Sequence, residues 1–480
     1  MKHFGSCTYV HAARQCFAAC FFLLFAATAL LFGEGCSSEK KAPPVKVGLG
    51  ETVITPSKNL QMRGFARSQV ATGVHDELHA RSLVIEGADG TATVMMSLSL
   101  VGIGRSYIER IRQGINEQTG IPEQNILVSC THTHAGPSVE RADEEYQAFV
   151  VDQAVLSTVE AWNTRAPARI GTGAATVMEL GRNRRRLLYG GLHPDPEVGI
   201  IKIEDADGVL KGVVFNYGCH PSALDWRNTL YSEDWPYYAI RGIKETAGEN
   251  VWVAYFQSAE GDINVGYSAE LSAVGAQMPI RNYEYIEHKG NQMADAVLDA
   301  LPGIATTSEA AVAVTTDTFD YPLRDSFPIT LAQAEKDADA AQKQLAALEK
   351  QQGIEGTRIL DKVRMDVFQT GQRLRTARRF FSSEKTEKTT SIEQQAIRIG
   401  DAVIVVLPGE VFSEIGLAIK EASTVDKTFL IGLANGYGGY LPSAKEFVEG
   451  DYEVDGSRYS DKTEKACVDA SLELIRRVSE

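Results

Sequence analysis

Short apolar runs alternate with polar breaks over most of this chain. Runs rich in Val, Ile and Leu that end at Gly, Pro, Asp or Ser predict β-strands, and apolar residues at helical spacing predict helices. The predicted strands cover residues 45–54, 75–86, 92–100, 126–128, 198–203, 212–217, 251–256, 392–399, 402–407 and 429–434, with a strand-rich stretch at 168–180. The predicted helices cover residues 107–117, 144–162, 237–247, 283–300, 466–478 and a segment after 412 that ends at about 422. This succession predicts an α/β fold with a mixed β-sheet core flanked by helices.

The segment from Leu331 to Phe381 differs from the rest of the chain. It is rich in Ala, Gln, Lys, Glu and Arg, and it is interrupted at Gly353 and Gly356. This composition predicts two amphipathic helices that form a hairpin, inserted at about residues 331–385. Strand signals recur on both sides of it, so residues 46–480 are predicted to be one large domain. A structural hairpin is favoured over a partner-binding element.

Residues 1–36 have the pattern of a targeting segment. Lys2 and Arg14 are followed by an apolar stretch at 16–33 and then by Cys36. This predicts a lipoprotein signal cleaved before a lipid-carrying Cys36, with a polar tether at 37–45. The alternative is an uncleaved anchor helix, because the apolar stretch is just long enough to span a bilayer. Both interpretations predict an exported chain, tethered in the cell envelope at the periplasmic or outer surface, or secreted.

Charge and cysteine content narrow the class of protein. The 480 residues carry a net charge of −15, which argues against a nucleic-acid partner because such proteins present a basic face. The sequence has seven cysteines, of which Cys130, Cys219 and Cys467 lie in the predicted domain. Cys130 and Cys219 could form a disulfide, but buried free thiols are the favoured interpretation.

Four of the predicted strands end in side chains that bind metals. His132 and His134 follow the strand at 126–128, and His220 follows the strand at 212–217. Glu410 follows the strand at 402–407, and Tyr437 and Tyr440 follow the last strand. His132 and His134 are two residues apart at the end of the strand at 126–128, so we expect both side chains to point to the same side, because side chains alternate along a strand.

A catalytic zinc takes three protein ligands, commonly His and carboxylate, and keeps one position for water. The residues at these strand ends would suit that site. Two of them also have a purely structural interpretation. His220 precedes Pro221 and could be a turn residue, and Glu410 follows Pro-Gly and could be a carboxylate near the start of a helix. The run Arg182 to Arg186 likewise has two interpretations, a solvated surface loop or an anion contact near a cleft.

The segment Thr131-His132-Thr133-His134-Ala135-Gly136-Pro137 resembles the Thr-His-Thr-His-Ser-Gly-Pro signature of the neutral/alkaline, non-lysosomal ceramidases. The resemblance extends to further segments in the same order. These are residues 47–56, Asn183-Arg184, His220-Pro221, Gly261-Asp262, Pro408-Gly409-Glu410 and the tyrosine-rich tail. It covers the catalytic domain of that family.

The resemblance implies a zinc-dependent hydrolase that cleaves the amide of ceramide, giving sphingosine and a fatty acid. It implies one Zn²⁺ per chain, with His132, His220 and Glu410 as ligands. The family has a zinc-binding tyrosine twelve residues before a second tyrosine of the site. Tyr440 and Tyr452 have that separation, so Tyr440 rather than Tyr437 is the implied ligand. His134 would then stand beside the metal or face the substrate.

The chain departs from the family pattern in two respects. Asn264 stands where the family has a serine implicated in catalysis, so this position cannot supply a nucleophile, although its amide could orient a substrate carbonyl. The sequence also stops at Glu480, before the C-terminal β-domain of full-length ceramidases.

Three hypotheses follow. In the first, the chain is a zinc amidohydrolase acting on a lipid-like N-acyl amide such as ceramide. Tyr452 or His134 would stabilise the oxyanion, and His134 or Asp262 would move the proton. In the second, the same scaffold acts on another amide or ester, such as a glycan-linked or cell-wall bond. In the third, the chain is a non-catalytic surface lipoprotein that binds a lipid or glycan, attached to the membrane by its N-terminal segment.

Overall fold

The computed structural model describes residues 43–65, 67, 69–186, 192–267, 281–382 and 387–480. The predicted signal at 1–36 and most of the tether at 37–45 lie outside these residues. The description below concerns the unit from Pro43 to Glu480.

An eight-stranded mixed sheet forms half of the core, in the order β11-β9-β8-β6-β1-β3-β4-β5. Its strands are β1 (Lys46–Val53), β3 (His79–Glu86), β4 (Ala92–Leu98), β5 (Ile126–Cys130), β6 (Ala166–Thr176), β8 (Glu197–Asp205), β9 (Leu210–Tyr217) and β11 (Trp252–Gln257). The pairs β4–β5 and β9–β11 are parallel, and the other neighbours are antiparallel. The two parallel pairs therefore lie at the two edges of this sheet.

The sheet curls so that its two edges approach each other. Ser97 of β4 donates a hydrogen bond of 2.6 Å to the carbonyl oxygen of Tyr255 in β11. Gln257 at the end of β11 donates to the carbonyl oxygens of Thr131 and Cys219, each at 3.2 Å. The loops that follow β5 and β9 therefore meet at one end of the sheet, although these strands are far apart in the strand order.

A second sheet of four strands packs against the first. Its order is β13-β14-β15-β17, and its strands are β13 (Val312–Pro322), β14 (Thr389–Ile399), β15 (Ala402–Val406) and β17 (Lys427–Ile431). Ile397, Ile404 and Phe429 share a buried cluster with Leu83, Met95 and Ile201 of the first sheet. The core is therefore a sandwich of two sheets, and β13 is a strand that the sequence analysis did not predict.

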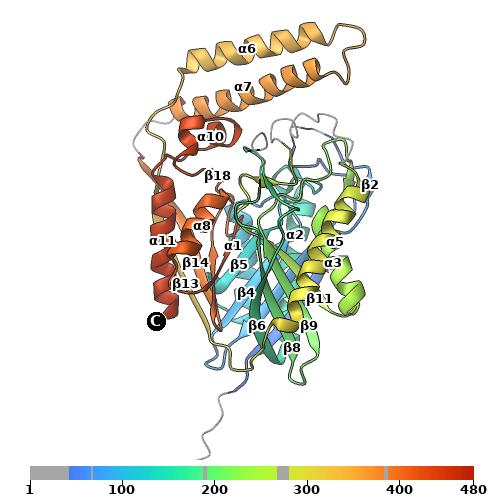
Figure 1. The fold of residues 1–480 in the computed structure, drawn as a ribbon, viewed down its shortest axis with the longest axis vertical. Helices are drawn as coiled ribbons and strands as arrows, with labels where there is room; N and C mark the ends of the chain where they lie inside the picture. The colour runs from blue at the N-terminus through green and yellow to red at the C-terminus, as the bar shows by residue number, and fades with distance from the viewer. Residues whose placement is uncertain (1–42, 66, 68, 187–191, 268–280, 383–386) are drawn as a thin grey trace, which may run out of the picture. The chain divides into compact units, whose positions relative to one another are not determined.

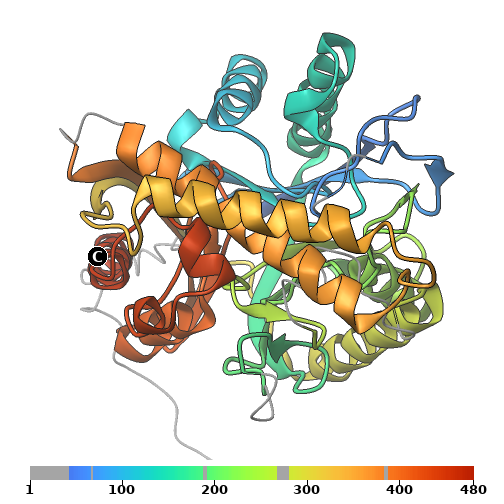
Figure 2. The same ribbon diagram turned by 90° about the horizontal axis from the view of Figure 1, so that it is seen from above.

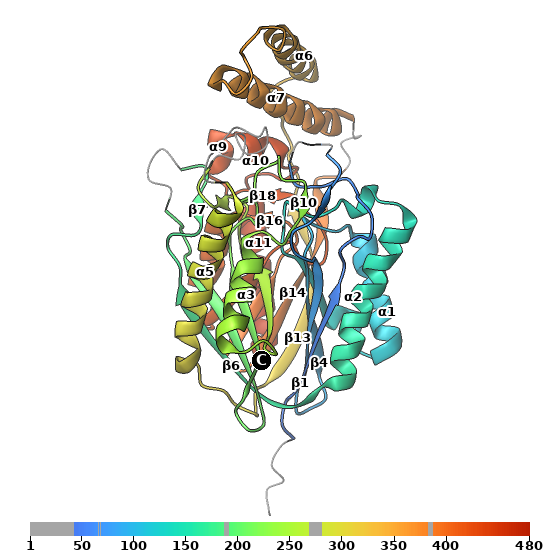
Figure 3. The same cartoon turned by 90° about the vertical axis from the view of Figure 1, so that its right-hand side faces the viewer.

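Helices cover the outer faces of both sheets (Figure 1). The larger ones are α1 (Arg105–Thr119), α2 (Glu144–Thr164), α3 (Trp235–Ala247), α5 (Tyr283–Ala300), α8 (Ser413–Ala422) and α11 (Thr463–Ser479). Figure 3 shows α1 and α2 on one side of the strands and α3 and α5 on the other. α8 and α11 pack on the second sheet through Ile415, Ile419 and Leu474.

Local sequence explains these contacts. In α1, Ile108, Ile111 and Ile115 form one buried stripe at helical spacing. In β1, a Cβ at Gly48 or Gly50 would lie under 2 Å from a backbone oxygen of α2, so these glycines allow the helix to approach the strand closely.

The predicted insertion is a helical hairpin made of α6 (Leu331–Leu348) and α7 (Arg358–Ser382). It lies across one end of the sandwich, as the view from above shows (Figure 2). Phe368 of α7 stacks on Tyr452 of the short helix α10 (Tyr452–Gly456), with ring centroids 5.3 Å apart. Arg373 of α7 forms an ion pair of 2.5 Å with Asp455.

Short elements surround this end of the sandwich. They are β2 (Gly73–Val74), β7 (Arg182–Asn183), β10 (Leu230–Tyr231), β12 (Ile263–Asn264), β16 (Glu410–Val411), β18 (Tyr440–Leu441), α9 (Glu446–Glu449) and the 3₁₀ turn Val139–Arg141. Two further 3₁₀ turns, Glu123–Asn125 and Leu301–Gly303, lie toward the opposite end. The α/β class, the flanking helices and the inserted hairpin are confirmed, whereas the division of the core into two sheets was not foreseen.

Two further observations bear on the sequence analysis. Cys130, Cys219 and Cys467 are buried free thiols, so Cys130 and Cys219 are not joined by a disulfide. Among the helices in the described ranges, none has both the length and the apolar character that crossing a bilayer requires.

Candidate active site

Three metal-binding side chains from three different loops converge at the end of the sandwich beneath the hairpin. The Nε2 atoms of His132 and His220 lie 3.5 Å and 3.3 Å from Oε2 of Glu410. All three residues are at least 98% buried. His132 follows β5, His220 follows β9, and Glu410 begins β16 after the end of β15.

His132 is not part of a strand. β5 ends at Cys130, and His132 has a φ of 72°, which is unusual for a residue other than glycine. The expectation that His132 and His134 share a strand face is therefore wrong. Their rings come together, with centroids 5.0 Å apart, because the loop turns sharply after the strand.

Backbone carbonyl groups fix the orientation of both histidine ligand candidates. Nδ1 of His132 donates to the carbonyl oxygen of Val101 at 2.6 Å, and Nδ1 of His220 donates to that of Ile263 at 2.9 Å. Each ring therefore carries its proton on Nδ1 and turns the lone pair of Nε2 toward Glu410. Burial, followed by the nearby Arg184, lowers the pKa of His220 to about 3, which keeps its ring neutral.

Glu410 is held on one side only. Its Oε1 accepts a hydrogen bond of 2.6 Å from the hydroxyl of Tyr437, whereas the buried Oε2 has no hydrogen-bond partner. An unpartnered carboxylate oxygen opposite two imidazole lone pairs is a donor set that fits a divalent cation.

A second carboxylate, Glu260, lies next to this set and was not selected from the sequence. Glu260 is fully buried, and both of its carboxylate oxygens lack a hydrogen-bond partner. One ligand atom each of His132, Glu260 and Glu410 lie within 4.8 Å of one another, and so do those of His132, His134 and His220. Burial, and then the charge of Glu410, raise the pKa of Glu260 well above its usual range.

His134 lies beside the two other histidines and lines the cavity described below. Its Nδ1 is buried and has no hydrogen-bond partner, and its ring packs edge-on against Phe65 with centroids 4.7 Å apart. Burial, and then His132 and His220, lower the pKa of His134 well below its usual value. The ring is therefore neutral, and its Nδ1 can accept a hydrogen bond.

Tyr437, Tyr440 and Tyr452 lie close together near Glu410 and differ in their contacts. The pairing of β16 with β18 places Tyr440 opposite Glu410. The hydroxyl of Tyr440, however, accepts a hydrogen bond of 3.2 Å from Arg184, whereas Tyr437 contacts Glu410 directly. Tyr452 packs against Tyr440 with ring centroids 5.8 Å apart. The assignment of Tyr440 as a metal ligand stays a prediction.

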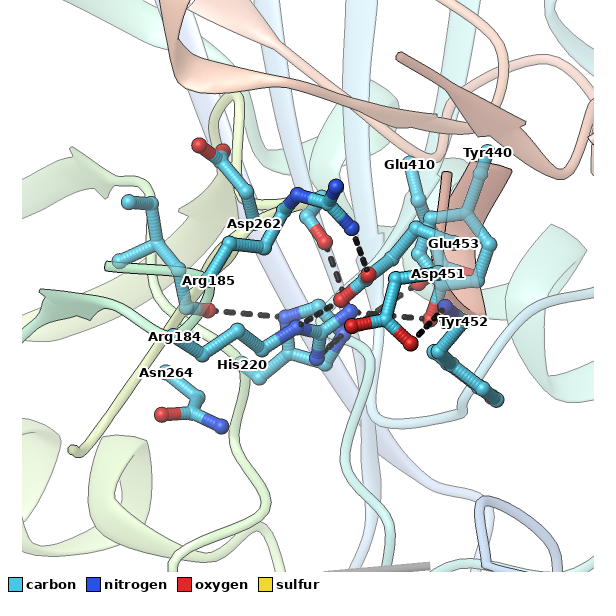
Figure 4. Close-up of polar contacts among 12 residues, drawn as sticks. Arg184, Arg185, His220, Asp262, Asn264, Glu410, Tyr440, Asp451, Tyr452 and Glu453 are labelled. Carbon is cyan, nitrogen blue, oxygen red and sulfur yellow. Dashed lines mark hydrogen bonds and ion pairs between the residues drawn. The ribbon is translucent and has the colours of Figure 1, made fainter. Parts of the chain in front are cut away.

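The arginine run belongs to the interior of the site, so the surface-loop interpretation is wrong for Arg184 and Arg185. Arg184 forms an ion pair of 2.7 Å with Glu453, and its Nη1 lies 3.2 Å from Nε2 of His220. Arg185 binds both Glu446 and Glu453 at 2.8 Å. Figure 4 shows Arg184 between His220 and Glu453. The run thus joins the loop after β6 to the C-terminal part of the chain.

Asp262 and Asn264 are close to this centre but are largely committed to structural contacts. The carboxylate of Asp262 accepts hydrogen bonds from Asn183 and from the backbone and hydroxyl of Ser413. Asp262 is not among the described residues that line the cavity, so the geometry does not support proton transfer by its carboxylate. Asn264 does line the cavity, while its amide group closes a turn with Gly266 and Tyr267.

A cavity of about 600 Å³ opens above the histidines. Its lining includes His132, His134 and Glu410 at the base and Tyr437, Tyr440 and Tyr452 at the side. Phe368, Gln372 and Arg375 of α7 also line it, so the inserted hairpin forms part of its wall. Such a volume is typical of a small-molecule binding site.

Comparison with known proteins shows which family this sequence resembles. Residues 45–269 match the family model "Neutral/alkaline non-lysosomal ceramidase, N-terminal". This part of the chain belongs to the ceramidase family. Its sequence is 26% identical over 224 residues to the neutral ceramidase of Oryza sativa subsp. japonica and 27% identical over 222 residues to that of Pseudomonas aeruginosa. These alignments cover 42% and 41% of the chain.

The same alignments cover only 28% and 33% of the two ceramidases, so the chain spans less than two thirds of the length of the relatives that it matches. The fold likeness extends further. A crystal structure of neutral ceramidase from Pseudomonas aeruginosa superposes with a TM-score of 0.68 at 20% identity, over 91% of this chain and 75% of that one. Glu410 and the tyrosines at 437–452 lie outside residues 45–269, which match the family model.

Proposed function

We propose that the chain is a metal-dependent hydrolase of N-acyl amide bonds, with a ceramidase-like reaction. One observation supports this most strongly. The Nε2 atoms of His132 and His220 each lie within 3.5 Å of Oε2 of Glu410, while both Nδ1 atoms donate hydrogen bonds to backbone carbonyl oxygens. Membership of the ceramidase family supports the choice of an amide as the bond that is cleaved.

One Zn²⁺ per chain would be held by His132, His220 and Glu410. Glu260 offers a further carboxylate on the buried side, and Tyr440 offers a phenol on the cavity side. When bound, the cation supplies an acidified water and polarises the carbonyl group of the substrate.

The chain's own residues supply the rest of the reaction. The Nδ1 hydrogen bonds hold both imidazoles in place, and Tyr437 holds Glu410. Water adds to the amide carbon, the carbon–nitrogen bond breaks, and one proton of that water reaches the departing amine. His134 is the neutral group in the cavity that can carry this proton, because its ring lies beside that of His132 and its Nδ1 is unpartnered.

Tyr452 packs against Tyr440 and lines the same cavity as the histidines. Its phenol would donate a hydrogen bond to the oxygen that becomes negative when water adds to the carbonyl carbon. Burial raises the pKa of Tyr452, so its hydroxyl keeps its proton near neutral pH.

A second candidate is the hydrolysis of a different amide, or of an ester, on the same scaffold. The observation that favours it is Asn264, which stands at the position of the family serine and whose amide oxygen is used by the backbone of Gly266 and Tyr267. A substrate that does not need the serine would be cleaved in this site.

The test measures fatty acid released from ceramide and from other N-acyl amides by the purified chain. We expect release that is lost on removal of metal by a chelator, restored by Zn²⁺, and abolished in His132→Ala. His288→Ala is the matched control, because His288 is exposed and lies outside the cavity. Bound zinc without cleavage of any amide would contradict the proposal.

Asn264→Ser separates the two candidates. Ceramide turnover in the wild type supports a ceramidase. The second candidate is supported if only Asn264→Ser cleaves ceramide while the wild type cleaves another amide or an ester.

A further inference from the structure

The cavity carries an unusual concentration of positive charge. The chain as a whole is acidic, with a net charge of −15. Yet the residues that line the cavity include one carboxylate, Glu410, and five arginines, namely Arg63, Arg67, Arg141, Arg184 and Arg375.

Two of these arginines have carboxylate partners. Arg184 is paired with the buried Glu453 at 2.7 Å, and Arg63 with Glu140 at 2.6 Å. Their charges are therefore largely balanced within the protein.

The other three arginines form no ion pair with a carboxylate of the described residues, although the charge of Asp225 acts on Arg67. Arg67 is held by the carbonyl oxygens of Trp226, Asn228 and His134 and by no carboxylate, and its Nε is buried without a partner. Within the part of the chain that the structure describes, the guanidinium groups of Arg141 and Arg375 form no hydrogen bond and no ion pair. Both side chains are exposed at the mouth of the cavity.

The hairpin determines the position of Arg375. Phe368, Gln372 and Arg375 are spaced by four and three residues, so they lie on one face of α7. Phe368 stacks on Tyr452, and Gln372 donates a hydrogen bond of 2.7 Å to the carbonyl oxygen of Tyr452. These contacts fix α7 against α10, and they keep Arg375 one turn further along the same face, over the cavity.

We propose that the substrate of this site is an N-acyl compound with an anionic group, which Arg375 of the hairpin binds together with Arg141 and Arg67. This inference rests on the proposed amide hydrolysis and adds the charge of the substrate to it. Guanidinium groups bind carboxylate, sulfonate and phosphate oxygens through charge-assisted hydrogen bonds. A neutral ceramide would leave these three charges without a partner.

The test compares amides that share one acyl chain and differ in charge. The neutral compound is N-dodecanoyl-ethanolamine, and the anionic compounds are N-dodecanoyl-glycine, N-dodecanoyl-taurine and the phosphate ester of N-dodecanoyl-ethanolamine. We expect kcat/KM to be about tenfold higher, or more, for at least one anionic compound, a preference that weakens as salt is added. The anionic compound that is preferred distinguishes a carboxylate from a sulfonate or phosphate.

Arg375→Gln should lower kcat/KM for the preferred anionic amide by about tenfold and change that for the neutral amide by less than about twofold. Arg378→Gln is the matched control on the same helix. Its side chain is exposed, pairs with Glu335 of α6, and does not line the cavity. Equal values for neutral and anionic amides, or the same preference in Arg375→Gln as in the wild type, would overturn the inference.

Calorimetric binding of N-dodecanoyl-taurine to the wild type and to Arg375→Gln separates this inference from the proposed function. If no amide is cleaved, weaker binding to Arg375→Gln still supports an anion site, and equal binding overturns it. Reduced binding of Arg375→Gln to vesicles of anionic lipid, with unchanged binding of the taurine amide, would assign the arginines to a membrane surface and overturn the inference as well.

Discussion

At the scale of single residues, two buried carboxylates stand beside His132, and they are held differently. Glu410 is anchored by Tyr437 through one oxygen, whereas neither oxygen of Glu260 has a partner. A buried, unpartnered carboxylate is costly unless a cation or a proton compensates it. The proposed metal would provide that compensation, and this leads to a test of Glu260.

Glu260→Gln should weaken Zn²⁺ binding by about 10- to 100-fold, because it removes a negative charge next to the donor set without changing the size of the side chain. Competition with a chromogenic chelator measures the affinity. Glu249→Gln is the control, because Glu249 is exposed on a distant loop. An affinity for Zn²⁺ equal to that of the wild type would show that Glu260 takes no part in holding the metal.

A second prediction at this scale concerns pH. His193 is 97% buried, its Nε2 donates a hydrogen bond of 2.8 Å to the carbonyl oxygen of Gly218, and its Nδ1 accepts one from the backbone of Asp195. Burial lowers the pKa of His193 from its usual value to about 4. Between the unfolded-state pKa of about 6.5 and pH 4, the unfolded chain binds the proton more tightly than the folded one.

Burial of neutral His193 therefore does not lower the free energy of unfolding above about pH 6.5. As the pH falls from 6.5 toward 4, protonation of this histidine in the unfolded chain lowers the free energy of unfolding. We expect the free energy of unfolding to drop by roughly 2–3 kcal/mol more between pH 7.5 and pH 4.5 in the wild type than in His193→Gln. Urea unfolding at the two pH values measures this difference. Parallel pH profiles for the two proteins would refute the assignment.

The sequence allowed the candidate ligands to be named but not their surroundings. His132, His220 and Glu410 could be selected because metal-binding side chains directly follow buried strands. Glu260 was not selected, although it belongs to the same strand exit as Asp262 and its carboxylate lies beside the candidate ligands. The direction of each side chain depends on backbone turns beyond the strand, such as the positive φ of His132, and no periodic pattern encodes these turns.

At the scale of elements, ion pairs join the arginine run of β7 and the loop after it to the C-terminal helices α9 and α10. We call this set of ion pairs the clamp. Arg185 and Glu453 are 93% and 99% buried at their side chains, and Glu446 is 95% buried. Removal of Arg185 would cost each of these buried carboxylates one of two arginine partners, because Glu453 also pairs with Arg184 and Glu446 with Arg186. The clamp therefore contributes to holding α10, and with it the wall of the cavity, in place.

Arg185→Ala should lower the free energy of unfolding by about 2–3 kcal/mol, because it removes charge-assisted hydrogen bonds from two buried carboxylates that keep one arginine each. Chemical denaturation measures the change. Lys465→Ala is the control, since its ion pair with Asp469 is exposed at both ends and its loss should cost about 0.5 kcal/mol or less. A change as small as that of the control would mean that the clamp does not stabilise the fold.

Most elements could be predicted because each has a local periodic signal, as the buried isoleucines of α1 illustrate. β13 was missed because its inner and outer positions are polar or half-buried along most of its length, which removes the alternation that marks a strand. The burial of Arg184 and Arg185 could not be predicted either. Their partners lie more than 250 residues further along the chain, where no local pattern connects them.

At the scale of the whole domain, the candidate ligands come from both sheets of the sandwich. His132 and His220 follow strands of the eight-stranded sheet, and Glu410 follows β15 of the four-stranded sheet. The sequence predicted strands but not their division into two packed sheets. The curl that brings the loops after β5 and β9 together depends on long-range contacts such as those of Gln257.

A cation on these ligands would join the two sheets, so metal should stabilise the folded domain as a whole. At free Zn²⁺ of about a thousand times the dissociation constant, binding to the folded state alone adds about 4 kcal/mol. We expect the Tm of the metal-free protein to rise by several degrees when Zn²⁺ is added, and the rise to disappear in His132→Ala and to persist in His288→Ala. Differential scanning calorimetry measures the shift. If Zn²⁺ raised the Tm of His132→Ala and of the wild type equally, the ion would be binding elsewhere, and the three residues would not form the metal site.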